Sequence, residues 1–247
     1  MAVVEKTIDI IGDDEFCKII IGRKIPEGMP VDIYDETVKS LRNYAFHATE
    51  GLESVNFPNV TTIGSQAFSD CPDLKSITFP KCTSCSGTYV FSNCYALESI
   101  DMPLLTYISD SGFSGCKKLV SVSLPSFTNS GRNLFAAASL LESVSLPKLS
   151  YVSAYSFTSC NALRQLDLPS VTSIGEGILF ASHAMEVVNI GPNITSIHSS
   201  AFSGTPDGMV INLPVAEGAI SGAPWGAPNA VINYEVPYSG DVPIPED

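Results

Sequence analysis

The stretch KCTSC at residues 81–85 holds the pair of cysteines whose type and spacing could do chemistry. Cys82 and Cys85 are three positions apart, a spacing found in half of a zinc site and in redox-active dithiols. A complete zinc site needs two further ligands, and the sequence has no second pair of Cys or His residues to supply them. The role of the two thiols therefore depends on the pattern of residues around them.

Several residue types recur with a period of 22 or 23 along the chain. The recurring prolines are Pro58, Pro80, Pro103, Pro125, Pro147, Pro169, Pro192 and Pro214. The recurring phenylalanines are Phe46, Phe68, Phe91, Phe113, Phe135, Phe157 and Phe202, with Leu179 or Phe180 filling the gap. The recurring leucines are Leu52, Leu74, Leu97, Leu119, Leu141 and Leu163, continued by Met185. Three columns that share one period predict a solenoid, in which neighbouring coils bury each other's apolar side.

A single repeat, LESVNFPNVTTIGSQAFSDCPD at residues 52–73, predicts the course of one coil. Within its first six residues, the apolar Val55 and Phe57 alternate with a polar residue, a spacing that is typical of a strand. Pro58 ends this strand because it lacks the N–H that a sheet requires. Val60 and Ile63 then point inward from a second short extended segment. Residues 67–68 are expected to close the coil on a short helical or 3-10 turn.

The repeated pattern L-x-x-V/I-x-L/F-P-x-V-T-x-I-x-x-x-A-F-x-x-C-x-x-L resembles the BspA-like leucine-rich repeats, also called the Treponema type. The resemblance covers about residues 31–214. Together with the period, it implies a mainly β fold: a leucine-rich-repeat solenoid of 22–23-residue coils, capped at both ends. Members of this family are mostly bacterial surface proteins implied in adhesion to host proteins or other cells, and similar repeats occur in phage and prophage proteins. The family shares no catalytic residues, so the resemblance assigns none here.

The period places both thiols of the KCTSC stretch at core positions. Cys82 lies 22 residues after Val60, and Cys85 lies 22 residues after Ile63. Other coils mostly carry aliphatic residues in these two columns. We therefore expect two buried thiols without a metal or redox role, although a disulfide within one coil is compatible with their spacing.

Four further cysteines share one column, which also holds Ala138 and Thr205. These four are Cys71, Cys94, Cys116 and Cys160. Small residues suit a tight turn, and a thiol packs as a small hydrophobic group. Because the total of seven cysteines is odd and Cys17 stands apart, no obligatory disulfide framework is expected.

A column of hydroxyl residues is almost as regular. It consists of Thr61, Thr83, Thr106, Thr128, Ser150, Thr172 and Thr195. Threonine favours extended backbone, and hydroxyls stacked on neighbouring coils can form hydrogen bonds. We expect this column to be a structural ladder and not a ligand site.

Composition argues against two classes of partner. Lys and Arg number 13 against 26 Asp and Glu, which gives a net charge of −13 that repels nucleic acid and anionic lipid headgroups. No apolar run reaches the ~18 residues that a membrane span needs, and the first residues lack the pattern of a secretory signal. We therefore expect neither nucleic-acid binding nor membrane insertion.

Residues for catalysis are scarce. The three histidines, His47, His183 and His198, belong to different coils. The sequence has no nucleophile elbow, zinc-protease motif, phosphate loop or dinucleotide fingerprint. The prediction is a chain that is not an enzyme, with no catalytic residue, metal or cofactor.

The ends of a solenoid expose apolar edges and need caps. A short helix is expected over residues 13–22, with a strand as the alternative because CKIII is rich in β-branched residues. Trp225 is expected to pack over the last coil, followed by a final strand in AVINYEV at 230–236. The predicted parts are an N-terminal cap at 1–30, the solenoid at 31–214, a C-terminal cap at 215–236 and a disordered acidic tail at 237–247.

Function is expected on the surface, where two columns of outward-pointing residues run across the first strands of successive coils. The candidate partner-binding residues are Glu53, Lys75, Glu98, Asp101, Glu142, Ser145, Arg164 and Asp167. We predict a non-enzymatic binding or adhesion module that presents these columns to a protein or glycan on a host or neighbouring cell. The alternative is a structural or receptor-binding component of a phage or prophage particle. Simple solvation of both columns is the competing interpretation.

Overall fold

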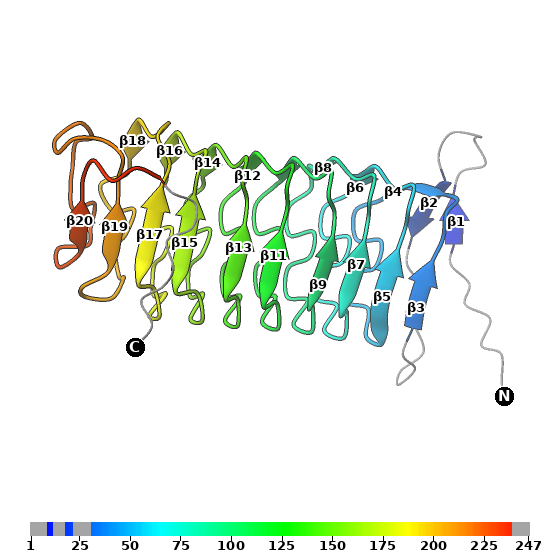
Figure 1. Cartoon of the computed structure of the whole chain (residues 1–247). Coiled ribbons are helices and arrows are strands. Elements are labelled where there is room, and N and C mark those ends of the chain that lie inside the picture. The colour runs from blue at the N-terminus through cyan, green and yellow to red at the C-terminus, as the bar shows by residue number, and fades with distance from the viewer. Residues whose placement is uncertain (1–8, 12–17, 22–30, 239–247) are drawn as a thin grey trace.

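The computed structural model describes residues 9–11, 18–21 and 31–238, and they form a β-solenoid (Figure 1). Each coil contributes a first strand to one side, and these strands pair in parallel with residues about 22 positions apart. The first strands are β3 (Val31–Tyr34), β5 (Leu52–Asn56), β7 (Ser76–Thr78), β9 (Ser99–Asp101), β11 (Ser121–Ser123), β13 (Ser143–Ser145), β15 (Gln165–Leu168), β17 (Val187–Ile190), β19 (Val210–Asn212) and β20 (Val231–Asn233). We call the outer surface of these strands the strand face.

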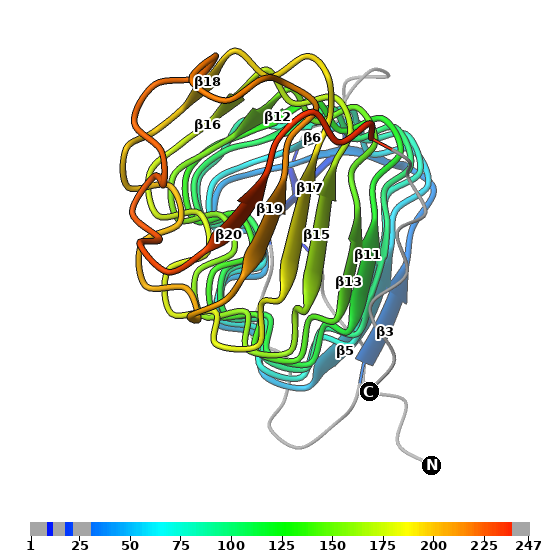
Figure 2. The same ribbon diagram turned by 60° about the vertical axis from the view of Figure 1, so that its left-hand side comes forward.

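A second, shorter strand in most coils builds another side of the solenoid. These strands are β4 (Val38–Leu41), β6 (Thr62–Ile63), β8 (Ser84–Cys85), β10 (Tyr107–Ile108), β12 (Asn129–Ser130), β14 (Tyr151–Val152), β16 (Ser173–Ile174) and β18 (Ser196–Ile197). They pair in parallel in the order β4-β6-β8-β10-β12 and, separately, β14-β16-β18. Figure 2 shows that the two sets of strands lie on different sides of the coil. We call the outer surface of the shorter strands the second-strand face.

The core is a continuous stack of the predicted columns. Phe68, Phe91, Phe113 and Phe135 are fully buried, and the ring centroids of successive members lie 5.3, 5.3 and 5.6 Å apart. In the coil that lacks this phenylalanine, Leu179 is buried and the neighbouring Phe180 is exposed. Each ring thus fills the space between the rings of adjacent coils, as the solenoid interpretation requires.

The closing turn of each coil differs from the expected helical or 3-10 turn, since none of the described residues is helical. In the first complete coil, Tyr44 and Ala48 have positive φ angles of 61° and 52°, which a right-handed helix cannot accommodate. The Tyr44 N–H donates to Ser65 O and the Phe46 N–H donates to Ala67 O of the next coil, at 2.9 and 2.6 Å. The turn is therefore a run of β-turns held by the neighbouring coil, and the helical expectation was wrong.

The N-terminal helix expected over residues 13–22 is also corrected where the structure describes it. Residues 18–21 form the strand β2 (Lys18–Ile21), as the alternative interpretation held, while the other positions of that segment lie outside the described residues. β2 pairs in parallel with β4 and antiparallel with β1 (Asp9–Ile11). The isoleucines of β2 favour extended backbone, and the hairpin covers the open edge of the first coil.

Trp225 packs at the C-terminal end of the solenoid, where the sequence placed it. Trp225 is fully buried, its ring lies edge-on to Phe202 at 6.5 Å, and its Nε1–H donates to Ser221 O at 2.9 Å. The strand expected in the 230–236 segment is β20, which pairs with β19. Most of the predicted acidic tail, residues 239–247, lies outside the described residues.

Two adjacent alanines in one closing turn allow a test of its left-handed backbone conformation. Ala137 has a φ of 60° at the position that Gly115 and Gly204 occupy in other coils, whereas Ala136 has no positive φ. We expect Ala137→Gly to raise the free energy of unfolding by about 1 kcal/mol, because glycine removes the steric cost of a left-handed residue. Ala136→Gly should lower it by about 0.5–1 kcal/mol, because glycine adds backbone entropy to the unfolded chain. Urea unfolding of both variants measures the difference, and equal signs would contradict the turn geometry.

Candidate functional site

The eight candidate partner-binding residues all lie on the strand face. Six are exposed and two, Glu53 and Asp167, are half-buried. They follow the pairing of the first strands, so that residues 22 or 23 apart are neighbours on adjacent coils. Their outward orientation is confirmed, whereas their role in binding stays a prediction.

Side chains near both ends of the strand face are already paired with each other. Towards the N-terminal end, Lys75 Nζ lies 2.8 Å from Glu53 Oε1, and this contact raises the pKa of Lys75. Towards the C-terminal end, Arg164 Nε donates to Glu186 Oε1 at 2.6 Å. Three of the eight candidates, Glu53, Lys75 and Arg164, are thus held in ion pairs between coils.

A ladder of hydrogen-bonded side-chain amides runs along the C-terminal coils of the strand face. Asn189 donates to Asp167, Asn212 donates to Asn189, and Asn233 donates to Asn212, at 2.7, 2.7 and 2.9 Å. Amides stacked in register satisfy each other from coil to coil. Asp167 is therefore part of a structural ladder, a role that its column position could not reveal.

The centre of the strand face has a different character. We define the central patch as Glu98, Asp101, Glu142 and Ser145. Their exposed side chains form no hydrogen bond or ion pair with another described residue, although the charge of Glu98 contributes to the raised pKa of Lys75. The sheet is interrupted on both sides of the two-stranded β11-β13 segment within this patch. Polar side chains that have no partner within the protein are available to bind one.

The Cys82–Cys85 pair occupies the core, as its columns predict. Both residues are fully buried free thiols whose sulfur atoms are 3.8 Å apart, so the disulfide left open by the sequence is not formed. The contact with Cys82, together with burial, raises the pKa of Cys85 well above its ordinary value. Among the described residues, no three His, Cys, Asp or Glu side chains are grouped as metal ligands would be.

The second column of cysteines has a hydrogen-bonding role that the sequence did not disclose. Cys71, Cys94, Cys116 and Cys160 each donate from the thiol to the carbonyl of the column phenylalanine one coil earlier, at 3.0–3.3 Å. Ser182 Oγ makes the same contact with Phe157 O at 2.6 Å. Burial raises the pKa of Cys71, Cys116 and Cys160 to about 12, so these thiols stay protonated near neutrality.

The hydroxyl column forms the predicted structural ladder. Thr106 Oγ1 donates to Thr83 O, Thr128 Oγ1 to Thr106 O, and Thr172 Oγ1 to Ser150 O, at 2.8–3.1 Å. The acceptor is the carbonyl of the preceding coil and not its hydroxyl. These hydroxyl groups tie neighbouring coils together.

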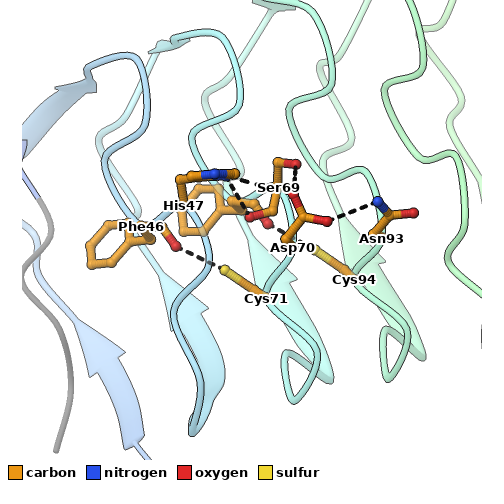
Figure 3. A network of polar contacts seen from close by, with 8 residues as sticks. Phe46, His47, Ser69, Asp70, Cys71, Asn93 and Cys94 are labelled. Atoms are coloured by element: carbon orange, nitrogen blue, oxygen red, sulfur yellow. Dashed lines mark hydrogen bonds and ion pairs between the residues drawn. The ribbon is translucent and has the colours of Figure 1, made fainter.

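A polar network on the closing turns brings His47, Ser69 and Asp70 together (Figure 3). Ser69 Oγ donates to Asp70 Oδ2 at 2.7 Å, and His47 Nδ1 lies 3.1 Å from the main-chain carbonyl of Ser69. Asn93 Nδ2 donates to the other Asp70 oxygen at 2.8 Å. Because His47 contacts the carbonyl and not the hydroxyl, these residues do not form a nucleophile–base pair. The network joins three adjacent coils.

Comparison with known proteins agrees with this geometry. The family profile described as the BspA type leucine rich repeat region matches in six copies over residues 31–136 and 87–207. The chain belongs to the BspA-type leucine-rich repeat family. No curated protein matches.

Two solved structures extend the comparison beyond the family profile. A leucine-rich repeat protein from Bacteroides ovatus is 21% identical with a TM-score of 0.64, over 96% of this chain and 68% of that one. The leucine-rich repeat protein of T. pallidum is 26% identical with a TM-score of 0.61, over 72% of this chain and 87% of that one. Both structures share the solenoid fold, which confirms the resemblance drawn from the repeats.

The BspA-type assignment fits a scaffold whose recurring residues are structural. The columns that define the family pattern are the buried phenylalanines, leucines and thiols of the core. No helix among the described residues is long and apolar enough to cross a bilayer. Differences between coils are concentrated in the outward columns, where binding specificity would have to lie.

The buried thiols predict how stability depends on pH. Burial raises the pKa of Cys160 from 9.0 to about 12, so above pH 9 the unfolded chain loses a proton that the native chain keeps. The free energy of unfolding should therefore fall with rising pH, by about 1.4 kcal/mol per pH unit for each such thiol, until pH approaches 12.

Cys160→Ser isolates this effect, because serine occupies the same column at Ser182 and does not titrate in this range. Urea unfolding with reductant present at pH 8, 9, 10 and 11 should show the variant gaining on the parent by about 1.4 kcal/mol per unit above pH 9. Parallel stability curves for the two proteins would contradict the buried-thiol assignment.

Proposed function

We propose that this protein is a non-enzymatic adhesion module that binds a protein or glycan on the surface of a host or neighbouring cell. The family supplies a repeat scaffold whose members are generally binding proteins, and the strand face supplies a surface on which to bind. The observation that carries the proposal is the contrast along that face. Side chains near its two ends are paired internally, and those of the central patch are not.

The central patch has the chemistry of an acceptor surface. Asp101 of β9, together with Glu98 and Glu142 directly before β9 and β13, contributes three carboxylates, and the exposed serines Ser121 and Ser143 lie on β11 and β13. Carboxylates accept hydrogen bonds from cationic and amide groups, while serine hydroxyls both donate and accept. Ser side chains are short, so little conformational entropy is lost when they are ordered by a partner.

The incomplete burial of two apolar residues at the centre of the strand face also favours a partner there. Ile100 of β9 and Val144 of β13 are only partly buried, although the equivalent residues Val55 and Ile77 are buried in the N-terminal coils. Binding energy concentrates where apolar groups at the centre of an interface are shielded from water. A partner seated over β9–β13 would cover the strands that carry these two residues and pair with the surrounding carboxylates.

Charge reversal tests the patch. Glu98→Lys combined with Glu142→Lys should weaken binding of the purified protein to intact cells at least about tenfold, because two acceptors become repulsive to the same partner. The melting temperature should stay nearly unchanged, since exposed charges contribute little to stability. Half-saturating concentrations on epithelial and bacterial cells, measured by flow cytometry, give the comparison.

Glu50→Lys combined with Glu217→Lys is the matched control. Both residues are exposed and lie outside the central patch, and the pair changes the net charge by the same amount. This control should bind like the parent. Treating the cells with protease or with periodate separates a protein partner from a glycan. Equal binding by parent and patch variant, or equal loss in the control, would reject the central patch as the site.

A further inference from the structure

A groove on the second-strand face has its own polar and aromatic lining, separate from the central patch. Its volume is about 650 Å³, within the range typical of small-molecule sites. It runs over β14, β16 and β18 and extends across the coil of β12 to Asp110. Figure 2 shows these strands on a different side of the coil from β13, β15 and β17.

The floor of the groove is formed where side chains are small or missing. Gly131, Ser153 and Gly175 occupy successive coils in the position just after the second strand. A Cβ on Gly131 would lie 2.3 Å from Asp110 N, and one on Gly175 would lie 2.9 Å from both Ala154 N and Val152 O. Coil packing thus requires glycine at these two positions of the lining.

One wall of the groove carries an exposed aromatic ring. The side chain of Tyr151 is 40% exposed and starts on β14. Its hydroxyl lies 3.1 Å from the position of a Cβ on Gly175, so the ring reaches from its own coil across to the next. An aromatic ring beside a floor without side chains offers a flat face on which a ligand can pack.

The lining also carries charged side chains that the protein holds in place. Asp110 Oδ1 accepts a hydrogen bond from the main-chain N–H of Arg132 at 2.8 Å. The Arg132 guanidinium lies 5.5 Å from the centre of the Tyr155 ring. Tyr155 Oη donates to Glu176 Oε1 at 2.7 Å. Because these contacts fix the side chains before a ligand arrives, binding loses less conformational entropy.

A histidine at the C-terminal end of the groove adds a directed donor. The Ser200 N–H donates to His198 Nδ1 at 3.2 Å, so in the neutral ring the proton is on Nε2. The lining therefore offers carboxylate acceptors, a guanidinium donor and an imidazole donor around one aromatic ring. With two carboxylates against one guanidinium, it also disfavours anionic ligands.

We propose that this groove binds a neutral oligosaccharide. Sugars combine apolar C–H faces, which stack on an aromatic ring, with hydroxyls that each donate and accept a hydrogen bond, and the lining supplies partners for both. The groove crosses five coils, from that of Asp110 to that of His198, and at ~4.8 Å per coil it extends about 19 Å. This length accommodates several sugar units.

The backbone argues against an extended peptide as the occupant. A peptide adds to a strand through unpaired main-chain groups. Here the N–H groups of Gly131, Gly175 and His198 already donate to Ile108, Val152 and Ile174 of the preceding coils, at 2.8–2.9 Å. The groove recognises its ligand through side chains, which suits a saccharide better than a strand.

The test uses the whole chain, a glycan array and calorimetry with the best neutral oligosaccharide. Tyr151→Ala should weaken binding about tenfold by removing the stacking face, and Glu176→Gln should weaken it severalfold by removing the carboxylate. Tyr107→Ala is the matched control, because Tyr107 occupies the same column, is similarly exposed and does not line the groove. It should bind within twofold of the parent, and thermal melts should show all three variants folded.

Each alternative result overturns the assignment in a distinct way. Binding of sialylated or sulfated glycans alone would reject a neutral ligand, and binding of peptides alone would reject a saccharide. Glycan binding that is lost in Glu98→Lys/Glu142→Lys but kept in Tyr151→Ala would place the glycan on the strand face, within the proposed function. Absence of any glycan binding would reject the groove as a saccharide site and leave the strand-face proposal intact.

Discussion

The stacking of each coil on its neighbour in constant register is the constraint on which the rest of this structure depends. A single coil cannot bury its own apolar side, and its strands are too short to stand alone. In register, Phe91 lies 5.3 Å from both Phe68 and Phe113. The same register lets the main chain of one coil pair with the next, as when the Phe91 N–H donates to Gly112 O. Apolar burial and backbone pairing therefore require the same repeat length.

Register also decides what polar side chains inside the coil can do. A thiol in the turn column lies where the carbonyl of the preceding coil needs a donor, and Cys116 meets Phe91 O there at 3.3 Å. The hydroxyl column serves the carbonyls of the second strands in the same way. Side chains whose types suggest reactive chemistry in the sequence thus form hydrogen bonds between coils instead. Burial keeps such thiols protonated and poorly nucleophilic.

Outward positions are free of this constraint, and they divide into structural and available groups. Ion pairs and the amide ladder use the side chains near the ends of the strand face, whereas the central patch forms no hydrogen bond or ion pair within the described part of the chain. On the second-strand face, close coil packing forces glycine at Gly131 and Gly175. The groove at these positions is lined by the Tyr151 ring and by charged side chains. The central patch therefore arises where coil packing leaves the side chain free, whereas the groove arises beside positions where packing restricts it.

The period of 22 or 23 residues was sufficient to predict the solenoid and its inward columns, because burial repeats with the coil. The packing of Trp225 at the end was predicted separately, because the last coil exposes an apolar edge. It also placed Cys82 and Cys85 in the core and turned the candidate residues outward. The closing turns and the strand at 18–21 were predicted as helical, because short apolar spacings fit a helix or an extended segment equally well.

Only the tertiary structure decided the sign of φ in those turns, because it follows from hydrogen bonds to the next coil, as at Tyr44. It likewise decided that Asp167 belongs to a ladder and that Glu98 does not pair. The groove had a faint signal in the sequence, the small residues after most second strands, whereas the position of Tyr151 over Gly175 had none. Contacts between coils join residues about 22 positions apart, and the side-chain rotamers that complete them are set by packing and not by the period.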